Sequence, residues 1–396
     1  MIVLSALVGL MAALLLLPTI SDLVSIAQLV RRKLRPVNAR PLRPAESPRL
    51  LFLVPAHDEE RMIHSCVRSL IDLRYPAGRF HAVVIADNCT DRTAELARAA
   101  GAQCLERHDR TLPGKPRAIA WALNQLPVNQ FDAVIIIDAD TVVDPGFAGA
   151  LAAAAPITGQ AYQAYFDVRN PDDTPLTRMN TVLAAANYRF AYALKRRVGL
   201  NAPLMGNGMC LGTQVLAAHG WKAFTIAEDW ESYALYTLEG VPIESLEAAH
   251  LYAQEARSLK QSSTQRQRWT AGKLTVLGRL VGRLLRSHKI GLAQKLDAVA
   301  ELSSPGPVVH LGLVIGLAAL TVVLRPAGAD WLLVGLAASV VRPLIYTLAG
   351  LTAQQDPLRS ALAFTFLPFY LVWRLGAAVA ALRMLGDKPW VRTARD

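Results

Sequence analysis

Two aspartates separated by one small residue follow an apolar run near the centre of the chain. Residues 134–137 are predicted to form a strand buried on both faces, and Asp138 and Asp140 stand where it ends. One carboxylate could bind a ligand hydroxyl and the other Mg²⁺ or Mn²⁺, which are hard ions that prefer oxygen ligands. Capping of the following turn is the simpler role for such a pair. The Asp-x-Asp spacing alone leaves both roles open.

Two further loops and a lysine follow the same pattern. Residues 55–60 (PAHDEE) and 86–91 (ADNCTD) also come after apolar runs. Asp87 is placed to accept a hydrogen bond from a nucleotide base or to lie near a diphosphate, and Lys115, before a predicted helix, could reach a phosphate. Glu59 is predicted in the first turn of a helix, where it complements the helix dipole or contacts a ribose. Clustered acids of this kind suit a divalent cation that bridges them to a phosphate.

An acidic pair begins a helix in the second half of the chain. Glu228 and Asp229 precede a tryptophan in the stretch AEDWE. If this loop meets the sheet edge, Asp229 is placed to take a proton from an attacking hydroxyl as a general base. A purely electrostatic role near the helix N-terminus explains the pair equally well.

The stretch QRQRW places three different functional groups on one helix face. Gln265, Arg268 and Trp269 fall at positions i, i+3 and i+4, so they offer an amide, a bidentate cation and an aromatic plane to one ligand. Arginine suits a pyrophosphate and tryptophan stacks on sugar rings. Alternatively, Arg268 belongs to a solvated basic face and Trp269 to a membrane-interface belt.

Alternating strands and helices are predicted to position these groups. Strands are expected over residues 51–54, 82–86 and 134–137, and helices over 59–73, 92–100 and 115–126. Later elements are a helix over 175–197, a glycine-rich loop over 204–210 and a helix from 226 to 239. This alternation predicts an α/β fold with a doubly wound, mostly parallel sheet, whose strand-ending loops share one edge.

Both ends of the chain are strongly apolar. The sequence is 53% hydrophobic and 18% charged, with a positive mean hydropathy, which is unusual for a soluble enzyme. We expect a membrane helix over residues 1–30 and two or three spans over residues 305–385, because each candidate segment approaches the roughly 20 residues that a bilayer needs. Arg342 and Arg374 fall within the last two segments, so one of these is expected to be re-entrant or steeply tilted.

Basic residues predict the orientation of the protein. The first apolar segment is closed by Arg31, Arg32, Lys33 and Arg35, and the tail carries Arg383, Lys388, Arg392 and Arg395. By the positive-inside rule, the central domain over residues 45–272 and the tail are both cytoplasmic. We therefore expect a multi-pass protein of the inner (plasma) membrane. Three full C-terminal spans would leave the tail outside, so the number of spans stays open.

A strongly basic stretch lies between the central domain and the apolar C-terminal region. Residues 257–289 contain nine Lys and Arg residues and no acid, within a chain of net charge +11. Leucines interleave with these charges at helical spacing, which predicts an amphipathic helix on anionic membrane lipids, within an interfacial helix region over residues 273–300. Nucleic acid is the competing anion, but the apolar ends favour lipid and no nucleic acid partner is expected.

Taken in chain order, these motifs resemble those of membrane-integrated family 2 glycosyltransferases, such as cellulose, hyaluronan and chitin-oligosaccharide synthases and ceramide glucosyltransferase. The series is VPAHDEE, ADNCTDRTAELARAAGA, GKPRAIAWAL, DAD, GNGM, AEDWE and QRQRW. Each motif is weak alone, but the ordered set is specific. Ala227 replaces the usual threonine, and Asn88 stands where many members have a second aspartate.

The resemblance implies a GT-A-like fold and a role for each site residue. Asp87 and Lys115 would contact the nucleotide, Asp138 the donor and Asp140 the metal, Mg²⁺ or Mn²⁺. Asp229 would be the catalytic base, with Glu228 beside it. The remaining substrate-binding residues would be Pro55, Glu59, Gln265, Arg268 and Trp269.

The implied reaction is one inverting displacement at the anomeric carbon of a nucleotide-sugar, with uridine as the expected base. The acceptor would be lipid-linked or a polysaccharide, presented at the cytoplasmic membrane face. Three alternatives stay open: a processive synthase that exports its polymer, a catalytically dead sugar-nucleotide-binding membrane protein, and a nucleotidyltransferase that releases pyrophosphate. The sequence does not set the donor sugar, the linkage or the oligomeric state.

Overall fold

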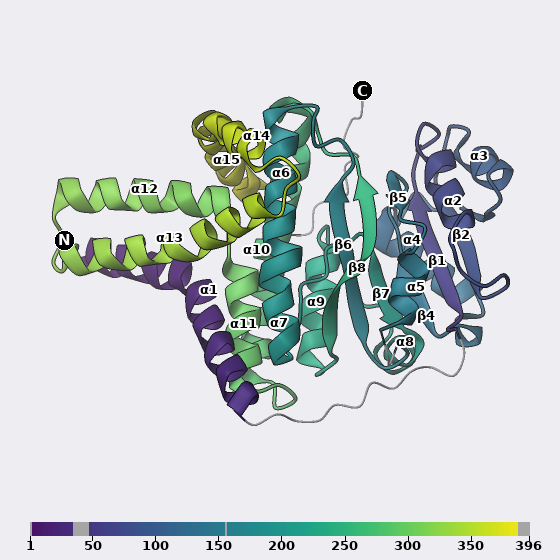
Figure 1. The fold of residues 1–396 in the computed structure, drawn as a ribbon, viewed down its shortest axis with the longest axis horizontal. Helices are drawn as coiled ribbons and strands as arrows, with labels where there is room; N and C mark the ends of the chain where they lie inside the picture. The colour runs from purple at the N-terminus through teal and green to yellow at the C-terminus, as the bar shows by residue number, and fades with distance from the viewer. Residues whose placement is uncertain (1, 35–46, 155–156, 387–396) are drawn as a thin grey trace.

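An eight-stranded sheet is the central element of the computed structural model, which describes residues 2–34, 47–154 and 157–386 (Figure 1). The strands are β1 (Leu50–Ala56), β2 (Phe80–Asp87), β3 (Gln103–Arg107), β4 (Ala133–Ile136), β5 (Thr141–Val143), β6 (Ala161–Val168), β7 (Met209–Gly212) and β8 (Ile243–Ala253). Their order is β3-β2-β1-β4-β7-β6-β8-β5. Only β7 and the edge strand β5 run antiparallel to their neighbours, so the predicted mostly parallel sheet is confirmed.

Helices cover both faces of the parallel half of the sheet. Alternate residues of β1 point to opposite faces. Phe52 packs in one cluster with α2 (Ile63–Ile71), and Leu51 packs in another with residues of α4 (Lys115–Gln125). Helix α3 (Thr93–Ala99) adds Ala97 to the first cluster. The sheet is therefore doubly wound, as the strand and helix alternation predicts.

Strands β3, β5, β6, β7 and β8 are not predicted from the sequence. The clearest difference is β7, because the loop expected over residues 204–210 ends at Gly208 and Met209 begins a strand. This strand has four residues and is paired with β4 and β6, so distant partners supply its hydrogen bonds. Such short pieces carry no periodicity of their own.

Further helices complete the central region around the sheet. The remaining helices of the central region are α5 (Phe147–Ala152), α6 (Pro175–Ala185), α7 (Tyr192–Val198), α8 (Thr213–His219), α9 (Glu228–Leu238), α10 (Leu259–Arg286) and α11 (Leu292–Ser303). The helix expected over residues 175–197 is present, but a π-helical segment, Ala186–Ala191, separates α6 from α7.

Helix α10 is continuous across the boundary predicted at residue 272. Part of its apolar stripe packs on protein, since Leu280 and Leu284 are buried in one cluster with Trp221 and Tyr233, whereas Leu285 is exposed. Leu280 and Leu284 therefore do not face lipid. The division between a catalytic domain and an interfacial helix region stays a prediction.

Four segments are long and apolar enough to cross a membrane: Ile2–Arg31, Pro307–Leu324, Ala329–Thr352 and Pro357–Met384. The helices that contain them are α1 (Ile2–Leu34), α12 (Pro307–Leu324), α13 (Ala329–Thr352), α14 (Pro357–Leu362) and α15 (Leu367–Ala381). These segments agree in place with the membrane helices expected from the sequence.

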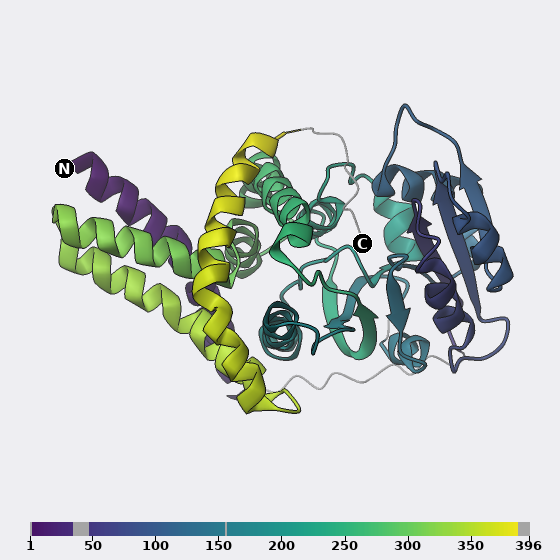
Figure 2. The same cartoon turned by 90° about the horizontal axis from the view of Figure 1, so that it is seen from above.

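The apolar helices do not all run in one direction. Helices α12 and α13 project from the rest of the molecule together with the first part of α1, and α15 lies across them against α10 (Figures 1 and 2). Helix α1 changes direction along its length (Figure 1), and Pro18 inside it removes a backbone hydrogen bond. Of the two arginine-bearing segments, α15 is thus the one that departs from the direction of the bundle.

Both arginines of these segments face protein. Arg342 Nε lies 2.8 Å from Asp22 Oδ2 on α1, and Arg374 Nη2 donates to Thr270 Oγ1 on α10 at 3.1 Å. A charged group at such a position is tolerated when it has a protein partner. Part of the predicted orientation signal falls outside the described residues, namely Arg35, Lys388, Arg392 and Arg395, as do residues 45 and 46 at the start of the predicted domain.

Candidate active site

A cavity of about 1510 Å³ lies at the carboxyl ends of β1, β2 and β4 and extends to the apolar helices. It brings together every site residue that the sequence predicts. These are Pro55, Glu59, Asp87, Lys115, Asp138, Asp140, Glu228, Asp229, Gln265, Arg268 and Trp269. Open α/β sheets bind ligands at this edge. The predicted positions are therefore one site in space, although their individual roles stay predictions.

Lys115 bridges the sheet edge and the start of α9. Its Nζ lies 2.6 Å from Asp138 Oδ1 and 3.1 Å from Glu228 Oε1, and it donates to the Gly206 carbonyl at 2.8 Å. Burial opposes the charged form, but the carboxylates of Asp138 and Glu228 outweigh it and raise the pKa of Lys115. A permanent cation therefore stands among the acids of the cavity.

Asp229 occupies the first turn of α9, beside this lysine cluster. Its Oδ1 accepts the Trp230 N–H at 2.8 Å. Burial and the neighbouring Glu228 raise the pKa of Asp229 to about 7, against the opposing effects of the Trp230 N–H and Lys115. A carboxylate whose pKa is near 7 is well matched to general base catalysis at neutral pH.

Asp87 is held by an arginine that belongs to no motif of the sequence. Arg107 is buried at the end of β3 and its Nη1 donates to Asp87 Oδ1 at 2.6 Å. The Gly114 N–H donates to the other carboxylate oxygen at 3.2 Å. Asn88 adopts a left-handed conformation with φ of 53°, and its Nδ2 donates to the Asp109 carbonyl at 3.0 Å. Asn88 thus orders the loop that presents Asp87 to the cavity.

Asn207 fixes the turn that carries the two aspartates. Its Oδ1 accepts the Asp138 N–H at 3.1 Å and its Nδ2 donates to Thr141 Oγ1 at 2.7 Å. The next residue, Gly208, has φ of 72°, and a Cβ there would lie 2.4 Å from the Leu251 side chain. The GNGM motif therefore has a positioning role. Its distance in the chain from Asp138 hides that role from sequence reasoning.

Asp138 and Asp140 offer carboxylate oxygens to the cavity, which is the ligand chemistry that Mg²⁺ and Mn²⁺ prefer. Asp138 Oδ1 already contacts Lys115, whereas Asp140 Oδ1 accepts the Thr141 hydroxyl at 3.3 Å. The donor set fits the predicted cation.

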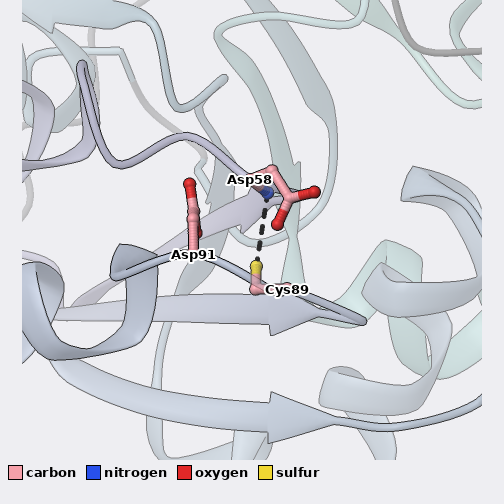
Figure 3. Close-up of side chains that lie close together, drawn as sticks. All are labelled: Asp58, Cys89 and Asp91. Carbon is pink, nitrogen blue, oxygen red and sulfur yellow. Dashed lines mark hydrogen bonds between the residues drawn. The ribbon is translucent and has the colours of Figure 1, made fainter.

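A second acidic group lies at the rim of the cavity. Figure 3 shows Asp58, Cys89 and Asp91 close together, and their candidate ligand atoms lie within 4.8 Å of one another. Burial raises the pKa of Cys89 to about 11, so this thiol is protonated at neutral pH and is a poor metal ligand. Asp58 Oδ1 accepts the Thr90 N–H at 2.6 Å. These contacts explain the group as a connection between two loops.

Helix α10 supplies the wall opposite the sheet. Gln265, Arg268 and Trp269 all line the cavity, as their predicted shared face requires. Trp269 remains 38% exposed, and the Arg266 guanidinium lies 4.9 Å from the centroid of its ring. One turn further along, Lys273 also lines the cavity and was not singled out in the sequence.

A family model described as "Glycosyltransferase like family 2" matches residues 48–272, which is more than half of the chain. The chain belongs to glycosyltransferase family 2. The predicted enzyme class is therefore confirmed.

Two curated relatives support the same family. The probable glycosyltransferase YdaM of Bacillus subtilis is 26% identical over 243 residues, which cover 59% of this chain and 57% of the relative. A beta-monoglucosyldiacylglycerol synthase of Nostoc sp. strain PCC 7120 is 28% identical over 236 residues, which cover 57% of this chain and 49% of the relative. The glycosyltransferase thus spans about half the length of the curated relatives it matches.

One solved structure resembles this glycosyltransferase over nearly its whole length. It is the mannosyltransferase PcManGT of Pyrobaculum calidifontis, solved with GDP-Man and Mn²⁺, which is 19% identical with a TM-score of 0.55. The match covers 96% of this chain and 98% of that chain. At this identity the likeness shows the fold, and it confirms the predicted GT-A-like sheet with flanking apolar helices.

The cavity of the glycosyltransferase does not end at its carboxylates. It continues between the apolar helices, where its lining includes Met11, Leu14 and Leu15 of α1, Leu313 of α12, and Leu375, Ala378 and Val379 of α15, together with a few polar residues such as His310, Ser339 and Arg342. One continuous cavity therefore has a polar end and an apolar end. A soluble substrate alone does not require the second.

Proposed function

We propose that this chain transfers a sugar from a nucleoside-diphosphate sugar to an acceptor presented at the membrane, with inversion at the anomeric carbon. The observation that carries the proposal is the placement of Asp229 in one cavity with Asp138 and Asp140. A general base for the attacking hydroxyl and a pair of carboxylates for a metal near the leaving diphosphate are thus available in the same cavity. The apolar extension of the same cavity supports an acceptor with a lipid part.

In the proposed mechanism, Asp229 takes the proton of the acceptor hydroxyl as its oxygen attacks the anomeric carbon. Glu228 and the buried surroundings keep the proton affinity of Asp229 high enough for this role. Lys115 holds Asp138 and Glu228 in place, and Arg268 and Trp269 face the donor from α10. A divalent cation held by Asp140 would neutralise the departing diphosphate.

The donor and the metal are supported by likeness. The structural neighbour PcManGT was solved with GDP-Man and Mn²⁺, and by extension a nucleoside-diphosphate sugar and Mn²⁺ or Mg²⁺ are proposed here. Uridine stays the proposed base on the motif resemblance. Pro55, Glu59, Asp87 and Gln265 line the same cavity, and we assign the first three to the nucleotide and Gln265 to the diphosphate.

The acceptor is proposed to be a membrane lipid or a lipid-linked glycan. The name of the Nostoc relative, a monoglucosyldiacylglycerol synthase, supports a lipid acceptor. We further propose that the four apolar segments make this a multi-pass protein of the plasma membrane, with residues 45–272 on the cytoplasmic face and the basic region over residues 273–300 near the lipid headgroups.

The test is release of nucleoside diphosphate by the detergent-purified protein. A panel of sugar nucleotides is offered with lipid extract, with and without Mn²⁺ or Mg²⁺. We expect metal-dependent release from one donor that is lost in Asp140→Asn and Asp229→Asn. The matched control is Asp72→Asn, which removes an exposed carboxylate that does not line the cavity and is expected to keep full activity.

The same assay separates the alternatives. Product from an α-linked donor should have the β configuration, and an α product would refute the single displacement. Pyrophosphate release would identify a nucleotidyltransferase. Lengthening of one acceptor chain would support the processive synthase, and donor binding without release from any donor would support a catalytically dead binding protein.

A further inference from the structure

Two cations line the cavity where its polar wall becomes apolar. Along α10 the lining residues change from polar side chains such as Gln265 to Leu274 and Leu277, and Lys273 stands at the change. Arg374 of α15 lines the same cavity and is followed by an apolar stretch of that helix. The two side chains thus mark the boundary between the carboxylates and the apolar helices.

Lys273 is enclosed without a counter-charge in contact. Its Nζ donates to the Ser304 carbonyl at 2.8 Å and lies 4.0 Å from the centroid of the Trp230 ring. Burial lowers the pKa of Lys273 to about 8, although Glu301 and Asp229 act in the opposite direction. Neither of these acids, nor any other carboxylate of the described residues, lies within 4.0 Å of its Nζ.

Arg374 has an unused hydrogen-bond donor. Its Nη2 contacts Thr270 Oγ1 at 3.1 Å, whereas its Nη1 is buried without a hydrogen-bond partner in the described part of the chain. Thr270 and Lys273 are three residues apart on α10 and so share a face of the helix. Arg374 and Lys273 therefore border the same part of the cavity.

Three other cations of the cavity, Lys115, Arg266 and Arg342, each have a carboxylate partner. The ion pairs are Lys115 with Asp138 and Glu228, Arg266 with Glu255, and Arg342 with Asp22. An enclosed cation without a counter-charge is destabilising, and a bound anion would offset that cost. Lys273 and Arg374 thus have the features of an anion-binding site that is filled by an anionic group of a bound ligand.

We propose that Lys273 and Arg374 bind the phosphate of an anionic amphiphile that serves as the acceptor. Its hydrocarbon part lies along the apolar end of the cavity, and its hydroxyl faces Asp229. The inference rests on the proposed function and narrows the acceptor to a phosphate-bearing lipid. In the transfer, Asp229 takes the hydroxyl proton, the acceptor oxygen bonds to the anomeric carbon, and the bond to the nucleoside diphosphate breaks with its electron pair. The lipid phosphate is unchanged.

The donor diphosphate is the other possible source of phosphate at this place. The lipid source is favoured because Leu274 and Leu277 adjoin Lys273, and Leu375 adjoins Arg374, on the cavity wall. A diphosphate belongs near the metal-binding pair, whereas an amphiphile needs a charged subsite next to an apolar one.

The experiment measures equilibrium binding of radiolabelled dodecyl phosphate to the full chain in neutral detergent. Inorganic phosphate and a nucleoside diphosphate with Mn²⁺ are the comparison ligands. The variants are Lys273→Gln and Arg374→Gln, with Lys273→Arg to restore the charge. Arg283→Gln is the matched control, because Arg283 is an exposed cation of α10 that does not line the cavity. Thermal unfolding confirms that each variant is folded.

We expect each Gln variant to bind dodecyl phosphate roughly ten- to hundredfold more weakly, the factor for one hydrogen bond to a charged group, and to bind nucleoside diphosphate normally. Lys273→Arg and Arg283→Gln should bind like the wild type. Equal dodecyl phosphate binding in all variants, loss of nucleoside diphosphate binding in folded Gln variants, or wild-type affinity no higher than for inorganic phosphate would each overturn the proposal.

A second arm compares sugar transfer to phosphatidylglycerol and to diacylglycerol in mixed micelles. We expect the wild type to prefer phosphatidylglycerol and Lys273→Gln to lose that preference. Equal use of both lipids by the wild type would refute the phosphate subsite. The binding arm needs no turnover, so failure of the proposed glycosyl transfer and failure of this inference give different results.

Discussion

Two lysines of this protein each stand between two carboxylates, and only one of them faces the cavity. Lys115 contacts Asp138 and Glu228, at 2.6 and 3.1 Å. Lys195 contacts Asp297 and Glu301, the latter at 3.1 Å. The same three charges therefore occur twice, once at the sheet edge and once between α7 and α11.

The two lysines differ in how far their side chains are exposed. The side chain of Lys115 is 20% exposed to the cavity, whereas that of Lys195 is 2% exposed. Asp297 also accepts the hydroxyl of Ser21 on α1 at 2.8 Å, so the second cluster joins the N-terminal helix to the rest of the fold. A charge cluster with access to a ligand can serve chemistry, and an enclosed one serves assembly.

The largest difference between the two regions is expected in turnover, when one acid at or beside each lysine is replaced. Asp229→Asn should lower turnover by roughly 10²- to 10⁴-fold, the usual contribution of a general base. Asp297→Asn should leave the turnover of the folded protein unchanged, because Asp297 does not line the cavity. Nucleoside diphosphate release checks both. Equal losses in the two variants would remove the distinction between the clusters.

Replacing each lysine should separate stability from activity. Lys195→Met leaves the buried Asp297 and the partly buried Glu301 without their cation and should lower the free energy of unfolding by roughly 3–5 kcal/mol. Lys115→Met should cost less stability, since its partners face the cavity, but should impair donor turnover. Chemical unfolding in detergent measures the first quantity. A larger stability loss for Lys115→Met would contradict the comparison.

Metal binding should stabilise the folded protein through the carboxylates of the cavity and not through the cluster around Lys195. At a hundredfold excess of metal and nucleoside diphosphate over the dissociation constant, the gain in unfolding free energy should be about 2.7 kcal/mol. A chelator should remove the gain, and Asp140→Asn should prevent it, whereas Asp297→Asn should retain it. Thermal unfolding with and without Mn²⁺ provides the measurement. An undiminished gain in Asp140→Asn would place the metal elsewhere.

The pH dependence of kcat/KM and of stability should come from Asp229. With the pKa of Asp229 raised to about 7, the fraction of ionised base falls below that pH, so kcat/KM should drop about tenfold per unit on acidification. Between about pH 4 and 7 the folded protein keeps the proton on Asp229, whereas the unfolded chain, in which the pKa of Asp is about 3.9, has lost it. Stability should therefore fall as pH rises from about 4 to 7.

Asp229→Asn provides the control for that pH effect on stability. The variant has no carboxyl to ionise at this position, so it should gain stability relative to the wild type at pH 8 and little at pH 4. Unfolding curves at the two pH values are the measurement. An equal difference at both would show that another group titrates.

The sequence predicts the parallel half of the sheet and the place of the aspartates well. Strands β1, β2 and β4 are continuous apolar runs, and such runs are visible without knowledge of their neighbours. Strands β7 and β5 are short pieces stabilised by partners far away in the chain, and they are not predicted.

Supporting residues of the site were missed for the same reason. Arg107 meets Asp87 only because β2 and β3 pair in that register, and Asn207 meets Asp138 across 69 residues. Neither residue belongs to a local pattern. Long-range pairing of this kind depends on sheet register, which single-sequence periodicity does not encode.

The sequence by itself determined the order of the motifs, the strand edge that carries Asp138 and Asp140, and the four apolar segments, because each depends on local composition and spacing. Only the tertiary structure decided that α15 crosses the other apolar helices and that one cavity joins the carboxylates to them. It also decided which cations find a carboxylate, since charge pairing depends on distances between elements that are separate in the chain.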